Sequence, residues 1–210
     1  MAVWTVFVEF LQSVLFTATQ VCGGNLGLGI IAAGLTLRLA LFPLTYRMAR
    51  ESRQRAELMK KLQPEIARLR TRHKDDPGAL MTAQAELFRR RGVKLFDGRS
   101  LFGGVVQMPF ALGMYTVVRR ALSVASPGRF LWIPNIARPD AILAVGVSLL
   151  TYAVVSLSAQ AGPQMSRALV LLPALVTLVA LTKFSAGLGL YWGASSVVGV
   201  VQGIMLRRER

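Results

Sequence analysis

The residue with the clearest chemical potential is Arg38, a cation inside the otherwise apolar stretch 26–44. A run of about 20 apolar residues is long enough to cross the hydrocarbon core of a bilayer. Placing an arginine at the centre of such a helix costs roughly 2.5–3.5 kcal/mol on insertion scales and roughly 10 kcal/mol or more in simulations. Arg38 therefore needs water, hydrogen-bond acceptors or an external anion, and it indicates a site that handles negative charge.

Polar side chains that could share a site with Arg38 occur in other apolar stretches. Tyr191, Ser195 and Gln202 are spaced so that they lie on one face of a helix. Serine and tyrosine recur every four residues in the stretch 141–159, and Gln107 lies in another apolar run. If these faces converge on Arg38, they form a wet, positively charged cavity inside the membrane. Two alternatives remain open: the polar groups bond only to neighbouring helices, or Arg38 snorkels to the interface, roughly 10 Å away at helical rise.

Composition argues against ordinary enzyme chemistry. Cys22 is the single cysteine and His73 the single histidine, so the chain offers no intramolecular disulfide, no His/Cys metal cluster and no Ser/His or Cys/His pair in a plausible pocket. We therefore expect no catalytic residues, no metal and no cofactor. The chain is 53% hydrophobic with a net charge of +15. That charge fits either nucleic-acid binding or the cationic cytoplasmic loops of a membrane protein, and its distribution decides between them.

The apolar stretches predict an all-α membrane protein with five transmembrane helices, which surround a hydrophilic groove if the polar faces converge on Arg38. The predicted spans cover about 26–44, 101–118, 141–159, 168–181 and 188–206. Residues 1–25 are expected to form an outer interfacial helix, with Val3, Phe7, Phe10, Leu11, Val14 and Ala18 on its apolar face, followed by a glycine hinge. No Lys or Arg precedes Arg38, so this helix lacks the basic start of a signal peptide and we expect it to be retained.

The cations set the orientation of these spans. Most of the 25 Lys and Arg residues lie in 46–100 and in the tail 207–210, which share one side of the membrane if the chain crosses five times. The positive-inside rule makes that side cytoplasmic, with the N-terminus outside. The cations at 119, 120, 129, 138 and 183 then fall on the outer side of the membrane.

Segment 46–100 carries two narrow apolar stripes separated by the turn sequence Asp75-Asp76-Pro77-Gly78. Leu58, Leu62, Ile66 and Leu69 form the first stripe, and Leu80, Ala83 and Leu87 form the second. Two such helices joined by a short turn should pair antiparallel, so we expect a cytoplasmic helical hairpin.

Four segments together resemble the YidC family of membrane protein insertases and its mitochondrial and chloroplast relatives. They are TLRLALFPLT (36–45), MKKLQPEIARLRTRHKDDP (59–77), VVQMPFALGMY (105–115) and GLGLYW (187–192) followed by Gln202, and they occur in family order. The chain departs from the family pattern in three places. Gly34 replaces the hydroxyl residue common one turn before the arginine, Ser195-Ser196 replaces Ser-Asn, and 93–98 lacks the usual Asn-Pro.

The resemblance implies a groove open to the cytoplasm and to lipid but closed on the outside. The expected groove residues are Arg38, Gln107, Tyr191, Trp192, Ser195 and Gln202. The expected receiving surface is the hairpin with Leu58, Leu62, Pro64, Ile66, Leu69 and Leu87. The implied function is insertion of nascent membrane proteins in the bacterial plasma (inner) membrane, with the bilayer, the ribosome and the Sec translocon as further partners and no role for DNA. A small-solute transporter or channel is the alternative, although no internal repeat and no acidic residue in a span supports it.

Overall fold

The computed structural model describes residues 2–74, 76–92, 98–124, 128–158 and 167–208, without the side chains of 98–107 and 167. The described residues are almost entirely helical, which confirms the all-α prediction. The helices are α1 (Ala2–Val21), α2 (Leu26–Ala40), α3 (Phe42–Arg72), α4 (Pro77–Arg90), α5 (Gly98–Val124), α6 (Ala141–Leu157), α7 (Arg167–Leu181) and α8 (Ala186–Arg208).

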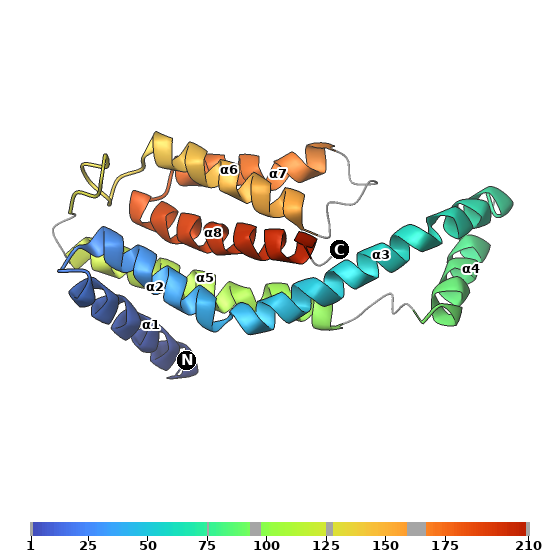
Figure 1. Cartoon of the computed structure of the whole chain (residues 1–210), viewed down its shortest axis with the longest axis horizontal. Helices are drawn as coiled ribbons and strands as arrows, with labels where there is room; N and C mark the ends of the chain where they lie inside the picture. Colours follow the sequence, from blue (N-terminus) through green and yellow to red (C-terminus); the bar gives the residue numbers. More distant parts are fainter. Residues whose placement is uncertain (1, 75, 93–97, 125–127, 159–166, 209–210) are drawn as a thin grey trace.

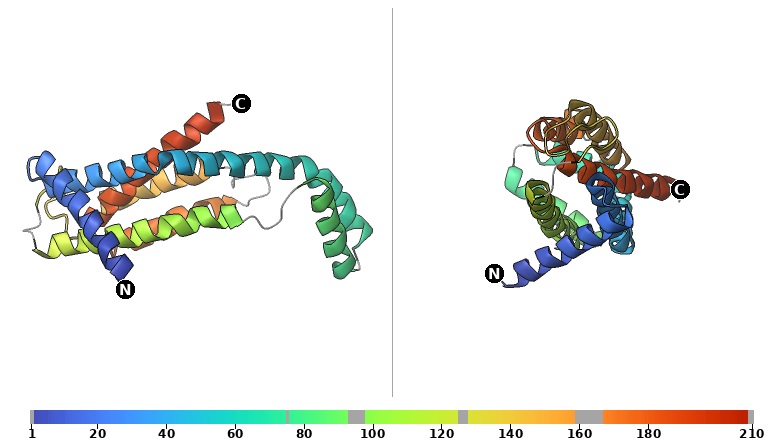
Figure 2. Two further views of the ribbon diagram at one scale, coloured as in Figure 1. Left: turned by 90° about the horizontal axis from the view of Figure 1, so that it is seen from below. Right: turned by 90° about the vertical axis from the view of Figure 1, so that its left-hand side faces the viewer.

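Helix α8 occupies the middle of the bundle, where it packs against α2, α5, α6 and α7 (Figure 1). Helix α1 lies obliquely across the bundle and contacts α2 and α5 (Figure 2). The larger apolar core joins α1, α2, α5, α8 and the loop around Phe130 and Ile136, with Leu11, Ile30 and Met114 fully buried. A smaller core joins α6 and α7 through Ala144, Val147 and Leu181. These two cores hold α8 between them.

Glycines allow α6 to approach α8 closely. A Cβ atom added at Gly203 would lie 2.7 Å from the Leu157 Cβ, and one added at Gly189 would lie 2.9 Å from the Leu143 Cδ2. Gly193 and Gly199 face α6 in the same way. Small residues at four-residue spacing are the usual means of bringing two membrane helices together, because apolar burial supplies no driving force between helices in lipid.

The chain bends by 59° between α2 and α3. The predicted span 26–44 therefore does not continue straight to its expected end, because the first helix stops at Ala40 and the next begins at Phe42. Pro43 lies in the first turn of α3, where backbone N–H groups have no partner within the helix. The missing N–H of proline therefore costs nothing there, and its fixed φ favours helix initiation. As a result the last residues of the predicted span and the first arm of the hairpin form one continuous helix of 31 residues.

The remaining expected elements agree with the structure in kind and differ at their ends. Helix α5 runs through Arg119 and Arg120 to Val124, six residues beyond the predicted end of the span at 118. Of the expected apolar face of α1, Phe7, Leu11, Val14 and Ala18 pack on the larger core together with Val8 and Leu15, while Val3 and Phe10 are exposed. By length and composition, α1 and α8 can each cross a membrane, α2 with α3 can form one bent span, and α6 is a shorter apolar helix, as are the residues 168–181 of α7.

Candidate functional site

Arg38 lies two residues before α2 ends at Ala40, and by the predicted orientation this end of the helix is the cytoplasmic one. Its side chain is half-buried, and its Nε atom is buried without a hydrogen-bond partner among the residues that the structure describes. Among the described residues, no carboxylate forms an ion pair with the Arg38 guanidinium. This agrees with the sequence, in which no acidic residue falls within a predicted span.

Tyr191 of α8 is the predicted site residue that the structure places beside Arg38. The two side chains are close enough to interact electrostatically. The Tyr191 ring also packs on Gly34, one helical turn before Arg38, where an added Cβ would lie 3.0 Å from the ring Cδ2 and 3.8 Å from the Ala194 Cβ. Gly34 thus leaves room for an aromatic ring next to the arginine.

The other predicted groove residues lie in different surroundings. Ser195 is half-buried one turn after Tyr191 on α8. Trp192 packs against the α6–α7 core, so its indole belongs to the opposite side of α8 from the α2 contact. The side chain of Gln107 falls outside the described part of the structure. The α2–α8 contact therefore joins Arg38 and Tyr191, with Ser195 nearby along the helix.

Gln202 fastens α8 to the beginning of α3. Its side-chain Nε2 donates to the Thr45 carbonyl oxygen at 3.1 Å, and the Thr45 hydroxyl donates to the Gln202 Oε1 at 3.4 Å. Gln202 is 8% exposed, so its amide is buried and these contacts satisfy it. Sequence reasoning placed Gln202 on the polar face of α8 but had no signal for Thr45 as its partner.

The polar face of α6 has local partners. The Ser148 hydroxyl donates to the Ala144 carbonyl at 2.7 Å, and Tyr152 is 41% exposed. The Ser156 hydroxyl is buried without a partner, while its carbonyl accepts from the Arg207 guanidinium at 2.9 Å. Helix α6 packs on α7 and α8, so this face contributes to the α8 side of the bundle.

Within the segment 46–100, α3 and α4 pack together and extend beyond the bundle, as expected for a helical hairpin (Figure 1). Asp76 caps α4 by accepting from the Gly78 and Ala79 amides at 2.9 Å each. Leu62 and Phe88 are the most buried side chains of the two helices, at 6% and 5% exposure. Phe88 is missing from the predicted seam, although it directly follows the predicted Leu87.

The remaining predicted hairpin residues are more accessible. Leu58 is 46% exposed and Pro64 is exposed, whereas Ile66, Leu69 and Leu87 are half-buried. Pro64 lies inside α3, which continues through it. The accessible apolar residues lie on the part of the hairpin that the resemblance assigns to substrates.

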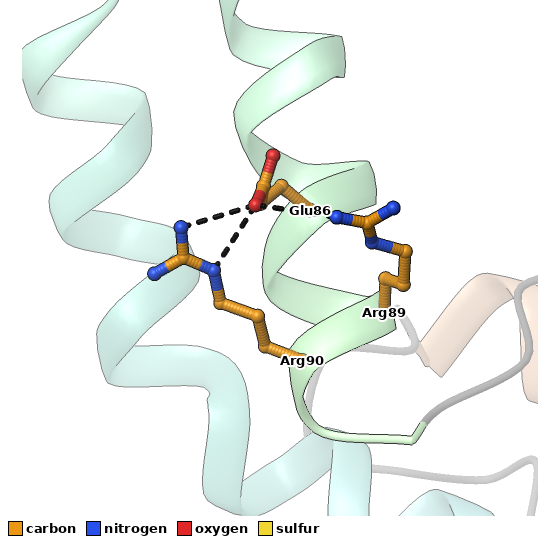
Figure 3. A network of polar contacts seen from close by, with 3 residues as sticks. All are labelled: Glu86, Arg89 and Arg90. Atoms are coloured by element: carbon orange, nitrogen blue, oxygen red, sulfur yellow. Dashed lines mark hydrogen bonds and ion pairs between the residues drawn. The ribbon is translucent and has the colours of Figure 1, made fainter.

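Ion pairs lie on α4, the second arm of the hairpin, and between its two arms. Glu86 pairs with Arg90 at 3.0 Å and with Arg89 at 3.7 Å (Figure 3). Arg91 donates to Glu65 at 2.6 Å and so links the two arms. All five side chains are at least 36% exposed, and exposed pairs contribute about 0–1 kcal/mol each. The hairpin therefore depends mainly on its buried apolar residues.

Comparison with known proteins decides the family. The sequence profile of the 60Kd inner membrane protein family matches residues 17–210, which include α2 to α8 and every predicted site residue. The chain belongs to this family. The resemblance to the YidC insertases is thereby confirmed, since proteins named membrane protein insertase YidC match over most of the chain.

Three of these relatives show how the share of their own length that matches this chain varies. A membrane protein insertase YidC of Helicobacter pylori is 28% identical over 189 residues, which cover 88% of this chain and 33% of that protein. One of Fusobacterium nucleatum is 26% identical over 212 residues, which cover 99% of this chain and 98% of the relative. A membrane protein insertase YidC 2 of Bacillus anthracis is 28% identical, with coverages of 98% and 81%. The chain thus spans about a third of the first relative and nearly all of the second.

Proposed function

We propose that this chain is a membrane protein insertase of the bacterial inner membrane, with five transmembrane segments, the N-terminus outside and the C-terminus in the cytoplasm. The observation that carries the proposal is the half-buried Arg38 with an unpartnered Nε, beside Tyr191 and without a carboxylate among the described residues. A cation held in this way is available to an anion that comes from outside the protein. The names of the relatives supply the class of substrate.

The proposed substrate is a nascent membrane protein whose short outer segment is polar or acidic. Moving a charged side chain through hydrocarbon costs several kcal/mol, so a hydrated groove beside Arg38 would lower the largest barrier. The apolar segment of the client then leaves sideways into lipid, and burial of its apolar surface drives the process. The chain's own residues supply position and charge, with no bond made or broken.

The hairpin of α3 and α4 is proposed to receive the client before the groove does. It extends beyond the bundle, carries many cations and exposes Leu58 near its seam. A cationic surface with accessible apolar residues suits a nascent chain and the ribosomal RNA from which it emerges. The Sec translocon is proposed as a further partner on the strength of the family resemblance.

Photocrosslinking tests the proposal. A photoreactive amino acid is placed at position 38, 191 or 195, and at Leu172 and Val179 on the exposed side of α7 as matched controls. A ribosome-stalled single-span client is expected to crosslink strongly at the first three positions and weakly at the controls. Equal or stronger capture by the α7 positions would contradict a path along the α2–α8 contact.

A further inference from the structure

A small hollow lined by cations lies at the end of the bundle opposite the hairpin. It has a volume of about 200 Å³ and is lined by Tyr115, Val118, Arg119, Lys183, Phe184, Ser185 and Leu188. A second hollow of about 400 Å³ adjoins it along α5 and shares Tyr115 and Arg119. The first volume is smaller than the roughly 300–1,000 Å³ typical of sites for drug-sized ligands, so it suits a small group.

The walls of the hollow are built from distant parts of the chain. Tyr115 and Arg119 lie one turn apart on α5, and Lys183 and Phe184 belong to the connection between α7 and α8. The rings of Tyr115 and Phe184 meet edge to face, with centroids 5.9 Å apart and planes at 71°. This contact fixes the connection against α5 and brings both cations to one hollow.

No acidic side chain among the described residues pairs with the cations of this hollow. Asp140 is the single acidic residue between Arg119 and Leu190 in the sequence. Its carboxylate accepts from the Leu143 amide at 2.7 Å and from the Trp132 indole at 3.3 Å, so it is committed elsewhere. Within the described ranges, neither the Arg119 nor the Lys183 side chain forms a hydrogen bond or an ion pair.

The first two backbone amides of α8 do not supply the attraction for an anion in the hollow, because both are already hydrogen-bonded. At the start of α8, the Ala186 amide donates to the Arg138 carbonyl and the Gly187 amide to the Ile136 carbonyl, at 2.8 Å each. These first two amides are therefore used by the preceding loop. The side chains of Arg119 and Lys183 supply the attraction for an anion.

The membrane supplies the anion that fits. By the charge distribution of the chain, this end faces outside, where cations are disfavoured by the positive-inside rule and so need a local reason. Trp132 at the same end is 53% exposed, as expected for an aromatic residue at the headgroup level. Arginine and lysine bind phosphate through charge-assisted hydrogen bonds. Basic pockets between membrane helices on the cytoplasmic side bind anionic headgroups, and the same chemistry is available to this pair of cations.

We propose that Arg119 and Lys183 bind the phosphate of an anionic phospholipid of the outer leaflet. The lipid headgroup occupies the smaller hollow between α5 and the α7–α8 connection, and the larger hollow along α5 takes the adjoining glycerol region. The bound lipid joins α5 to α7 and α8 at their outer ends. This binding site is independent of the groove proposed around Arg38.

Lipid titration followed by native mass spectrometry tests the site. The full chain, purified in a neutral detergent, is titrated with phosphatidylglycerol, with phosphatidylcholine and with inorganic phosphate. Each cation near a membrane surface contributes about 1 kcal/mol. The Arg119→Gln/Lys183→Gln variant should therefore bind phosphatidylglycerol about 30-fold more weakly, which is about 2 kcal/mol at about 1.4 kcal/mol per tenfold.

Matched variants keep this test specific. Arg129→Gln/Arg138→Gln removes two cations of the same end that line neither hollow, and it should keep wild-type affinity. Arg119→Lys/Lys183→Arg keeps both charges and should bind within about threefold of wild type. Equal weakening in the Arg129/Arg138 pair, or no weakening in the Arg119/Lys183 pair, overturns the site. Binding of inorganic phosphate without phosphatidylglycerol overturns the lipid as its ligand.

Discussion

The ring of Tyr191 lies against the backbone of Gly34, so closely that a Cβ at position 34 would come within 3.0 Å of the ring. This contact sits one turn before Arg38 and fixes the spacing of α2 and α8 at the proposed groove. A hydroxyl-bearing residue at position 34 would compete with the Tyr191 ring for the same volume. In this chain the ring itself borders the arginine.

The Gly34–Tyr191 contact predicts a coupled pair. Gly34→Leu should destabilise the protein by about 1–3 kcal/mol because the added atoms meet the ring. Tyr191→Ala in the same chain should recover part of that loss, because it vacates the space. Thermal unfolding of the purified single and double variants in detergent measures the coupling. Additive losses would show that the two residues do not share the volume.

Arg38 predicts selectivity for the charge of the client. Arg38→Ala should reduce insertion of clients with acidic outer segments about tenfold or more, since several kcal/mol of charge stabilisation are at stake. Arg38→Lys should retain most of the activity, because it keeps the charge. Insertion into inverted vesicles or liposomes, scored by protease protection, provides the measurement. Clients with neutral outer segments are the matched control, and an equal loss for both kinds would count against a charge role.

The hydrogen bonds between Gln202 and Thr45 are expected to fix the direction in which α3 leaves the bundle. Gln202→Leu removes the donor to the Thr45 carbonyl and should cost about 0.6–1.7 kcal/mol, the range of such bonds between membrane helices. It should also broaden the distances between spin labels at Arg72 and Val201, measured by pulsed electron paramagnetic resonance. Thr45→Val removes the longer hydroxyl contact to Gln202, together with the bond from this hydroxyl to the Phe42 carbonyl, and should broaden them less because the Gln202 Nε2 donor remains. Unchanged distributions in Gln202→Leu would show that other contacts hold the bend.

The α6–α8 contact predicts opposite effects for two glycines. Gly203→Ala should destabilise the protein by about 1–3 kcal/mol, because its Cβ would lie 2.7 Å from the Leu157 Cβ. Gly146→Ala has no neighbouring atom within 4 Å and should stabilise α6 by roughly 0.5–1 kcal/mol. Thermal unfolding in one detergent compares the two variants. Unchanged or raised stability of Gly203→Ala would mean that the approach of α6 to α8 is not limited by Gly203.

The buried apolar residues of the hairpin are expected to contribute more to its stability than its exposed ion pairs. Leu62→Ala should destabilise α3 and α4 locally by about 2–5 kcal/mol, since this side chain is buried. Glu65→Gln removes the exposed pair with Arg91 and should cost about 1 kcal/mol or less. Hydrogen exchange of the α3 and α4 amides measures both. Greater loss of protection in Glu65→Gln would reverse the assigned order of contributions.

Much of the fold was predictable because its signals are local. Apolar stretches marked α2 and α5 to α8, and the turn sequence around Asp76 and Pro77 marked the hairpin. The break at Leu41 was missed because Pro43 looks like the end of a helix. Proline is equally at home in a first turn, and the sequence alone does not distinguish the two roles.

The candidate site was predictable in part. Arg38 stands out by charge and Tyr191 by helical spacing, and the packing of α2 on α8 brings them together. The Thr45–Gln202 contact joins residues 157 positions apart and depends on how the helices dock, for which no local pattern exists. The α6–α8 seam carried a usable signal, since Gly189 and Gly193, like Gly199 and Gly203, are four residues apart.

The continuity of α3 has a mechanical consequence. At 1.5 Å per residue, the 31 residues of α3 span at most about 46 Å, because the helix contains Pro64 and curves toward its far end (Figure 2), and its base adjoins the bend at Leu41. The bend lies three residues beyond Arg38, so a tilt of α3 by about 5° at Leu41 would move its far end by up to about 4 Å. A ribosome or client that pushed on the far end of α3 would therefore rotate the base of this helix close to the arginine.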